Sequence, residues 1–174
     1  WEETFAAIRD IFAKETQRHR ELQTSEKCDG YNRKIYEKLA AGKVSEVELA
    51  SALLDLSAML HKHYGIAPII IIDEYDTPIQ QGYMKDYYDK VIQFMRNLFS
   101  GGFKDNPHLS FGFLTGILRV AKESIFSGMN NLSINSVLDN KYSSYFGFTA
   151  DEVMKMAEYY GAADKYDEIC QWYD

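Results

Sequence analysis

The sequence has 174 residues, of which 46% are hydrophobic and 14% aromatic, and this composition excludes a disordered chain. The net charge of -7 argues against a broad nucleic-acid-binding face, because phosphate binding needs clustered lysine and arginine. Two widely separated cysteines fit neither a disulfide framework nor a metal-binding spacing, and no apolar run approaches the roughly 20 residues of a membrane span. We therefore expect a cytoplasmic protein that does not enter a membrane.

The first part of the chain predicts three helices. Apolar residues recur there at the spacing of one helical face, over residues 2–22, 30–42 and 45–64. The third helix has the best-marked start, because Ser45 and Glu48 form an S-x-x-E capping box. Four consecutive isoleucines then occupy residues 69–72. A β-branched run without polar alternation predicts a strand buried on both faces, as in the middle of a parallel sheet.

The second part alternates helices and strands. Residues 80–82 predict a loop, residues 109–115 and 132–138 predict strands, and helices are expected at residues 83–100, 149–160 and 164–172. Gly112 weakens the strand at 109–115 but permits another group to approach its backbone closely. Thr149 and Glu152 form a second capping box. The alternation predicts an α/β fold with a parallel sheet.

Three acids, Asp73, Glu74 and Asp76, follow the isoleucine strand directly. Ligands of open α/β sheets bind outside the carboxyl ends of the strands. Four apolar residues followed by Asp-Glu match the Walker B pattern of P-loop NTPases. In that pattern the Asp holds the Mg²⁺ that bridges the nucleotide phosphates, and the Glu orients the attacking water. A buried strand followed by a solvated acidic turn has the same sequence, and the pattern alone does not decide between them.

Thr115 and Arg119 follow the second strand. A polar residue at the tip of a strand beside the Walker B strand is where a γ-phosphate sensor would lie. An arginine four residues later could reach the phosphates or a neighbouring subunit's nucleotide. On residue type alone, a strand-ending turn and a surface arginine explain both. The four histidines show no H-E-x-x-H or Cys-His spacing, which argues against a zinc centre.

Three segments of the sequence stand out together. They are Ile-Ile-Asp-Glu-Tyr-Asp-Thr-Pro-Ile at 71–79, the long motif at 114–132, and Phe-Gly-Phe-Thr-Ala-Asp-Glu-Val at 146–153. Together these segments resemble the bacterial AAA-ATPase-like proteins. The final Trp-Tyr-Asp resembles that family's Trp-Tyr-Asp-Gly-Tyr, and the similarity extends from about Leu49 to the end. The resemblance implies a P-loop NTPase-like parallel sheet flanked by helices over residues 1–145, with the start of a helical lid at 146–174. Members often carry a PD-(D/E)XK nuclease-like domain.

The resemblance also assigns roles to the residues at the strand ends. It makes Asp73 the Mg²⁺-associated acid and Glu74 the catalytic acid, and it places Thr115 and Arg119 in the sensor region, with Arg119 as a catalytic candidate. Asp76 joins Asp73 and Thr115 as a candidate for binding the nucleotide. ATP and Mg²⁺ are the implied cofactors. The roles of Asp76, Lys122, Asn130 and Asn131 are not settled by the resemblance.

One departure from the family is large, because the sequence contains no G-x-x-x-x-G-K-[ST] segment. Without the P-loop that cradles the phosphates, we expect a fragment that begins after the P-loop, has no useful ATP affinity of its own and holds no cofactor tightly. We also expect an exposed sheet edge or apolar face, which dimerisation could cover.

Three functions stay open at this point. The intact parent would bind and hydrolyse ATP, with an attached nuclease-like domain as one partner, while the fragment itself would be inactive. A non-catalytic protein-interaction module with the same fold would suit the 13 tyrosines. A metal-dependent nuclease would use Asp73, Glu74 and Asp76. No direct nucleic-acid binding is expected from this segment in the ATPase interpretation.

Overall fold

In the computed structural model the chain forms two compact units, residues 1–132 and 133–174, which are described separately. The structure describes residues 1–117, 125–126, 129 and 132–173. Unit 1 is mostly helical and contains a small parallel sheet. The class is therefore mixed α/β, as expected, whereas the full sheet of a P-loop NTPase stays a prediction. The division into an ATPase core and a lid at residue 145 also stays a prediction.

The first helices of unit 1 confirm the helical patterns, with changes at their ends. They are α1 (Glu2–Arg18), the 3-10 helix η1 (Arg20–Thr24), α2 (Gly30–Ala40), α3 (Glu46–Ala50) and α4 (Ala52–Tyr64). The capping box is formed, since Glu48 Oε2 accepts from the backbone N of Ser45 at 2.8 Å and Ser45 Oγ accepts from the backbone N of Glu48 at 3.3 Å. The single helix predicted over residues 45–64 is interrupted at Ser51.

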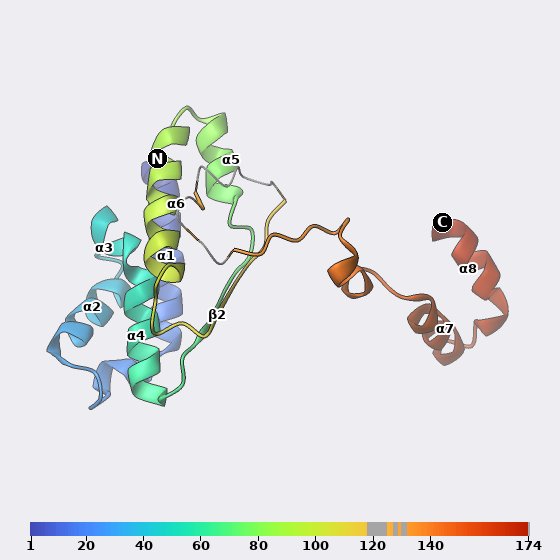
Figure 1. Ribbon diagram of the computed structural model, residues 1–174, viewed down its shortest axis with the longest axis horizontal. Coiled ribbons are helices and arrows are strands. Elements are labelled where there is room, and N and C mark those ends of the chain that lie inside the picture. The colour runs from blue at the N-terminus through green and yellow to red at the C-terminus, as the bar shows by residue number, and fades with distance from the viewer. Residues whose placement is uncertain (118–124, 127–128, 130–131, 174) are drawn as a thin grey trace. The chain divides into compact units, whose positions relative to one another are not determined.

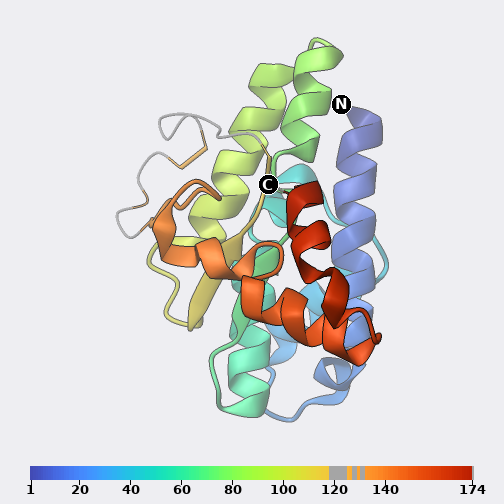
Figure 2. The ribbon, with the colours of Figure 1, turned by 90° about the vertical axis from the view of Figure 1, so that its right-hand side faces the viewer.

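Two more helices connect the two strands. They are α5 (Thr77–Met84) and α6 (Tyr88–Phe103), which lie side by side in Figures 1 and 2. The loop predicted at 80–82 is wrong, because these residues belong to α5. Pro78 lies in the first turn of α5, where its missing N–H costs nothing. Gly82 allows the close packing of α5 on α6, since a β-carbon there would lie 2.5 Å from Val91 Cγ1.

The strands β1 (Ile69–Ile72) and β2 (Phe111–Leu114) pair in parallel, with Ile69 opposite Phe111 and Ile72 opposite Leu114. Figure 1 shows the long helices α1, α4 and α6 on one side of this strand pair. Residues that point to that side pack against the core, among them Ile70, Ile72 and Leu114. Gly112 lies against the ring of Phe103, to which a β-carbon would come within 2.6 Å. This is the close approach that the glycine predicted.

The other face of the sheet is open in unit 1. The exposed fractions of its four residues are 60% for Ile69, 70% for Ile71, 58% for Phe111 and 49% for Phe113. The prediction of a strand buried on both faces is therefore wrong for the described residues, and the expectation of an exposed apolar face is confirmed. An exposed face with four large apolar side chains indicates a surface that more protein can cover.

Unit 2 contains short helices. They are η2 (Asn140–Tyr145), α7 (Ala150–Tyr159), η3 (Ala163–Lys165) and α8 (Tyr166–Tyr173). The predicted capping box is formed, with Thr149 Oγ1 accepting from the backbone N of Glu152 at 3.4 Å. The strand predicted at 132–138 is wrong, because these residues lie in irregular structure and a turn. Ser136 Oγ accepts from the backbone N of Leu138 at 3.1 Å, a local bond that competes with strand pairing.

The helices that the structure describes are too short or too polar to cross a bilayer.

Candidate functional site at the carboxyl ends of the strands

The two parallel strands end at the same edge of the sheet, so the residues that follow them meet. The strand pairing continues past the strands themselves. Thr115 N donates to Ile72 O at 2.9 Å, and Tyr75 N donates to Thr115 O at 3.1 Å. These two backbone bonds hold Asp73 and Thr115 next to each other, although 42 positions separate them in the sequence.

The side chains of Asp73 and Thr115 are hydrogen-bonded directly. Thr115 Oγ1 donates to Asp73 Oδ1, and the backbone N of Glu74 donates to the same oxygen at 3.0 Å. Asp73 is solvent-exposed. Among the described residues no hydrogen bond reaches its second oxygen, Oδ2. The result is an exposed, oriented carboxylate in which Oδ1 accepts two hydrogen bonds and Oδ2 accepts none from a described residue.

Glu74 occupies a strained backbone conformation beside this pair. Its φ is +51°, in the left-handed region that residues other than glycine, asparagine and aspartate rarely adopt. The backbone N of Thr77 donates to Glu74 O at 3.0 Å, which closes the turn into α5. The side chain is exposed. Such strain costs on the order of 1–3 kcal/mol and occurs often at functional sites.

Asp76 points into the protein and is only 1% exposed. Its Oδ2 accepts from the backbone N of Ile117 at 3.1 Å and from Gln80 Nε2 at 3.0 Å. Gly116 packs directly on this carboxylate, since a β-carbon at 116 would lie 2.7 Å from Asp76 Oδ1. Asp76 therefore joins the turn after β1 to the loop after β2 from the inside.

The predicted site residues are thus found in different places. Asp73 and Thr115 are in contact at the surface, Glu74 is next to them, and Asp76 lies beneath. Arg119 lies outside the described residues, as do Lys122, Asn130 and Asn131. The sequence pattern had indicated no site role for Gly116 or Gln80. A Gln four residues after an Asp at a helix start was the available signal for Gln80, and a Gly after a strand-ending Thr was the signal for Gly116.

The arrangement presents two exposed carboxylates, Asp73 and Glu74, of which Asp73 is oriented by the hydrogen bond from Thr115. Among the described residues no three His, Cys, Asp or Glu side chains group closely enough to hold a metal ion. Mg²⁺ does not need such a cage, because it binds through one or two carboxylates together with phosphate oxygens and water. A hollow of about 890 Å³ lies elsewhere, at the turn between α5 and α6, where Tyr83, Tyr87 and Lys90 line it. Asp73, Glu74 and Asp76 do not line this hollow.

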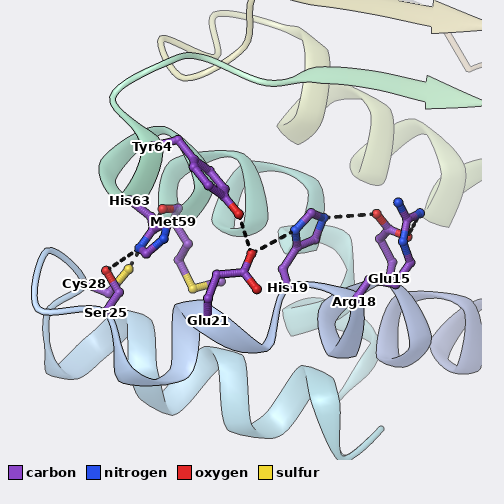
Figure 3. A network of polar contacts seen from close by, with 9 residues as sticks. All are labelled: Glu15, Arg18, His19, Glu21, Ser25, Cys28, Met59, His63 and Tyr64. Atoms are coloured by element: carbon purple, nitrogen blue, oxygen red, sulfur yellow. Dashed lines mark hydrogen bonds and ion pairs between the residues drawn. The ribbon is translucent and has the colours of Figure 1, made fainter.

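A second polar network joins α1 and η1 to the end of α4 (Figure 3). Tyr64 Oη donates to Glu21 Oε1 at 2.6 Å. This bond is the main cause of a lowered pKa at the Glu21 carboxyl and a raised pKa at the Tyr64 hydroxyl. His19 lies between Glu15 and Glu21, 3.4 Å from each. The network joins these elements through groups that already have partners.

Unit 1 is a mixed α/β unit with acids at the carboxyl edge of a parallel sheet. A family profile described as "Predicted AAA-ATPase" matches residues 1–126. The match covers most of the chain, so the chain belongs to the AAA-ATPase-like family.

One curated relative is the "Uncharacterized protein in vnfD 5'region" of Azotobacter chroococcum mcd 1, which is 34% identical over 122 residues. The aligned part is 69% of this chain but 23% of that protein, so the chain spans less than a quarter of the relative's length. No solved structure matches the chain.

Proposed function

We propose that this chain supplies the acidic, Mg²⁺-binding half of an ATP-hydrolysing site. The observation that carries the proposal is the hydrogen bond from Thr115 Oγ1 to Asp73 Oδ1, across the ends of two paired parallel strands. In this proposal Asp73 is the Walker B acid. Its Oδ2 would bind a water of the Mg²⁺ shell or the ion itself, while Thr115 keeps the carboxylate in one orientation.

Glu74 is the proposed general base. Its exposed carboxylate follows the Mg²⁺-associated acid directly, so a water between it and the γ-phosphate could lose a proton to it. The left-handed backbone of Glu74 supports a specialised role, because a turn without a function would be more stable with glycine at this position. Thr115 then has two tasks, which are orienting Asp73 and sensing the γ-phosphate. Arg119 stays a proposed catalytic residue on its resemblance alone.

Asp76 is proposed as a positioning residue instead of a direct ligand of the nucleotide. Its buried carboxylate accepts hydrogen bonds from Ile117 N and Gln80 Nε2, so it fixes the loop after β2 relative to α5. This burial also weighs against the metal-dependent nuclease, which would need Asp76 beside Asp73 and Glu74 at one metal ion. The interaction-module alternative keeps one supporting observation, the exposed apolar face of the sheet.

The phosphate-binding half is proposed to lie on a P-loop outside these 174 residues, because the sequence contains no Gly-Lys-Ser or Gly-Lys-Thr. Backbone N–H groups and a lysine would then come from that P-loop, and the acids from this chain. The first test is calorimetric titration of MgATP into the 174-residue chain and into a longer protein that carries a P-loop. We expect micromolar binding of MgATP by the longer protein and no such binding by the 174-residue chain. Micromolar binding by the short chain would overturn the proposed division of the site.

A variant of Thr115 tests the role of its hydroxyl in the same titration. Thr115→Val keeps the shape of the side chain and removes the hydroxyl that orients Asp73. In the longer protein it should weaken Mg²⁺-dependent ATP affinity by roughly tenfold, the worth of about one charge-assisted hydrogen bond. ATP affinity in the absence of Mg²⁺ should change less, because only the proposed contact of Thr115 with the γ-phosphate is then lost. Equal loss with and without Mg²⁺ would mean that Thr115 does not act through Asp73.

A further inference from the structure

Two histidines meet at the opposite end of the sheet, near the amino ends of the strands. His61 lies in the last turn of α4, and His108 lies in the segment that leads from α6 into β2. Their Nδ1 atoms are 3.2 Å apart, and their rings meet edge to face with centroids 5.4 Å apart. Both side chains are half-buried, so solvent still reaches them. No local spacing could indicate this pair, since 47 positions separate the two residues.

We propose that His61 and His108 form a binding site for a divalent d-block cation, with Zn²⁺ as the ion whose geometry fits best. Zn²⁺ binds imidazole nitrogen at about 2.0–2.1 Å in tetrahedral geometry, so two such nitrogens lie roughly 3.3 Å apart. The observed Nδ1 separation of 3.2 Å is close to that value. Neutral imidazole selects Zn²⁺, Ni²⁺ and Cu²⁺ over Mg²⁺ and Ca²⁺. This site is therefore chemically distinct from the carboxylates proposed for Mg²⁺.

A metal ion needs the lone pair of Nδ1 on both rings. In the contact of 3.2 Å one of these nitrogens donates to the other, and which one donates depends on the tautomer. The donating ring would therefore carry its hydrogen on Nε2 when the ion is bound. Each Nδ1 then offers a lone pair to the metal. Water would fill the remaining positions, because no third His, Cys, Asp or Glu of the described residues joins the pair.

Asn106 holds the two histidines in place. Its Oδ1 accepts from the backbone N of His108 at 2.9 Å. Its Nδ2 donates to Gly102 O at 2.8 Å and to Ser57 Oγ at 2.9 Å. Ser57 lies one turn before His61 on the same helix. One side chain therefore fixes the backbone of one histidine to the helix that carries the other.

The bound ion would link α4 to the segment that enters β2. The first backbone bond of the strand pair lies two residues later, where Ser110 N donates to Pro68 O at 2.9 Å. A cation at the pair would stabilise the folded state in proportion to its occupancy. It would do so at the end of the sheet away from Asp73 and Thr115, so the inference does not depend on the proposed ATPase function.

The experiment is calorimetric titration of Zn²⁺ into the 174-residue chain, with His61→Gln and His108→Gln as the test variants. Two matched controls are His63→Gln and His19→Gln. Both residues belong to the network of Figure 3, where His63 Nδ1 contacts Ser25 Oγ at 2.8 Å and His19 lies between two carboxylates. Circular dichroism of each variant confirms that it is folded.

We expect one Zn²⁺ per chain, a loss of at least tenfold in affinity in either test variant, and no change beyond twofold in either control. The double variant should lose no more than the single variants, because both ligands serve one ion. Asn106→Ala should weaken binding less than removal of a ligand does. The absence of one-to-one binding would overturn the proposal, as would unchanged affinity in His61→Gln and His108→Gln or an equal loss in His63→Gln. Any of these outcomes would mean that His61 and His108 form a hydrogen bond with each other and no metal site.

Discussion

Gly116 lies directly against the carboxylate of Asp76, with room for a hydrogen but not for a methyl group. A β-carbon at 116 would lie 2.7 Å from Asp76 Oδ1 and 2.8 Å from Tyr75 Cε1. Neither neighbour can move freely, since Asp76 is 1% exposed and Tyr75 packs its ring on Phe99 and Phe126. The loop after β2 can therefore approach the turn after β1 only with glycine at this position.

The first prediction is that Gly116→Ala destabilises the chain by about 1–3 kcal/mol, the cost of forcing a methyl group into a packed site. Urea denaturation measures the effect. Gly30→Ala is the matched control, because a β-carbon at Gly30 would meet nothing within 4 Å. It should leave stability unchanged or raise it slightly. Equal stability of the two variants would contradict the close packing of Gly116 on Asp76.

The second prediction concerns the backbone strain at Glu74 and its effect on stability. Glu74→Gly should stabilise the chain by about 0.5–1 kcal/mol, because glycine adopts a φ of +51° without steric cost. Glu74→Ala removes the same carboxylate and keeps the strained backbone, so its stability should match that of the wild type. Thermal and urea denaturation of both variants provide the comparison. If Glu74→Gly were no more stable than Glu74→Ala, the turn would hold no strain.

The third prediction concerns the two faces of β1. Ile71 is 70% exposed, whereas Ile70 packs against the core. Ile70→Ala should cost about 2 kcal/mol, and Ile71→Ala less than about 0.5 kcal/mol in a monomer. Denaturation at several protein concentrations tests both. A large, concentration-dependent cost of Ile71→Ala would show instead that a second copy covers the open face.

The fourth prediction is a pH dependence at the Tyr64–Glu21 hydrogen bond. This bond holds the pKa of Glu21 below its usual range, so its stabilising effect is fully present above the ordinary glutamate pKa. The effect is lost as the pH falls through the lowered pKa of the folded protein. Tyr64→Phe should raise the pKa of Glu21 toward its ordinary value, which NMR titration of the carboxyl carbon measures.

A stability comparison completes this test. The difference in unfolding free energy between wild type and Tyr64→Phe should shrink as the pH falls through the folded pKa of Glu21. Tyr31→Phe is the control, because Tyr31 is 63% exposed on α2 and does not belong to the network in Figure 3. A Glu21 pKa that does not move in Tyr64→Phe would exclude the hydrogen bond as the cause of its shift.

Features encoded by neighbouring residues were predictable from the sequence. The capping boxes at Ser45 and Thr149 formed as expected, because each needs only a residue three positions away. The isoleucine run predicted β1 through its β-branched composition. Even the meeting of Asp73 with Thr115 followed from a general rule, since parallel strands end at one edge.

Features that depend on distant partners and follow from no such general rule were not predictable. Asp76 looked like one of three equivalent acids, yet its partner Ile117 N lies 41 positions away and draws it into the interior. The glycine at 82 suggested a loop, although packing against Val91 places it inside α5. The alternating exposure of the four isoleucines depends on what covers the second face of the sheet, and a uniform apolar run carries no information on that.

The central claim is that Glu74 and Asp73 form the catalytic half of an ATPase site. The most direct measurement is steady-state ATP hydrolysis, together with MgATP affinity, for Glu74→Gln in the longer protein that carries a P-loop. The amide keeps the size of the side chain but cannot accept a proton from water. We predict MgATP affinity within twofold of the wild type and turnover reduced roughly 100-fold or more. Turnover at the wild-type rate with unchanged affinity would contradict the account.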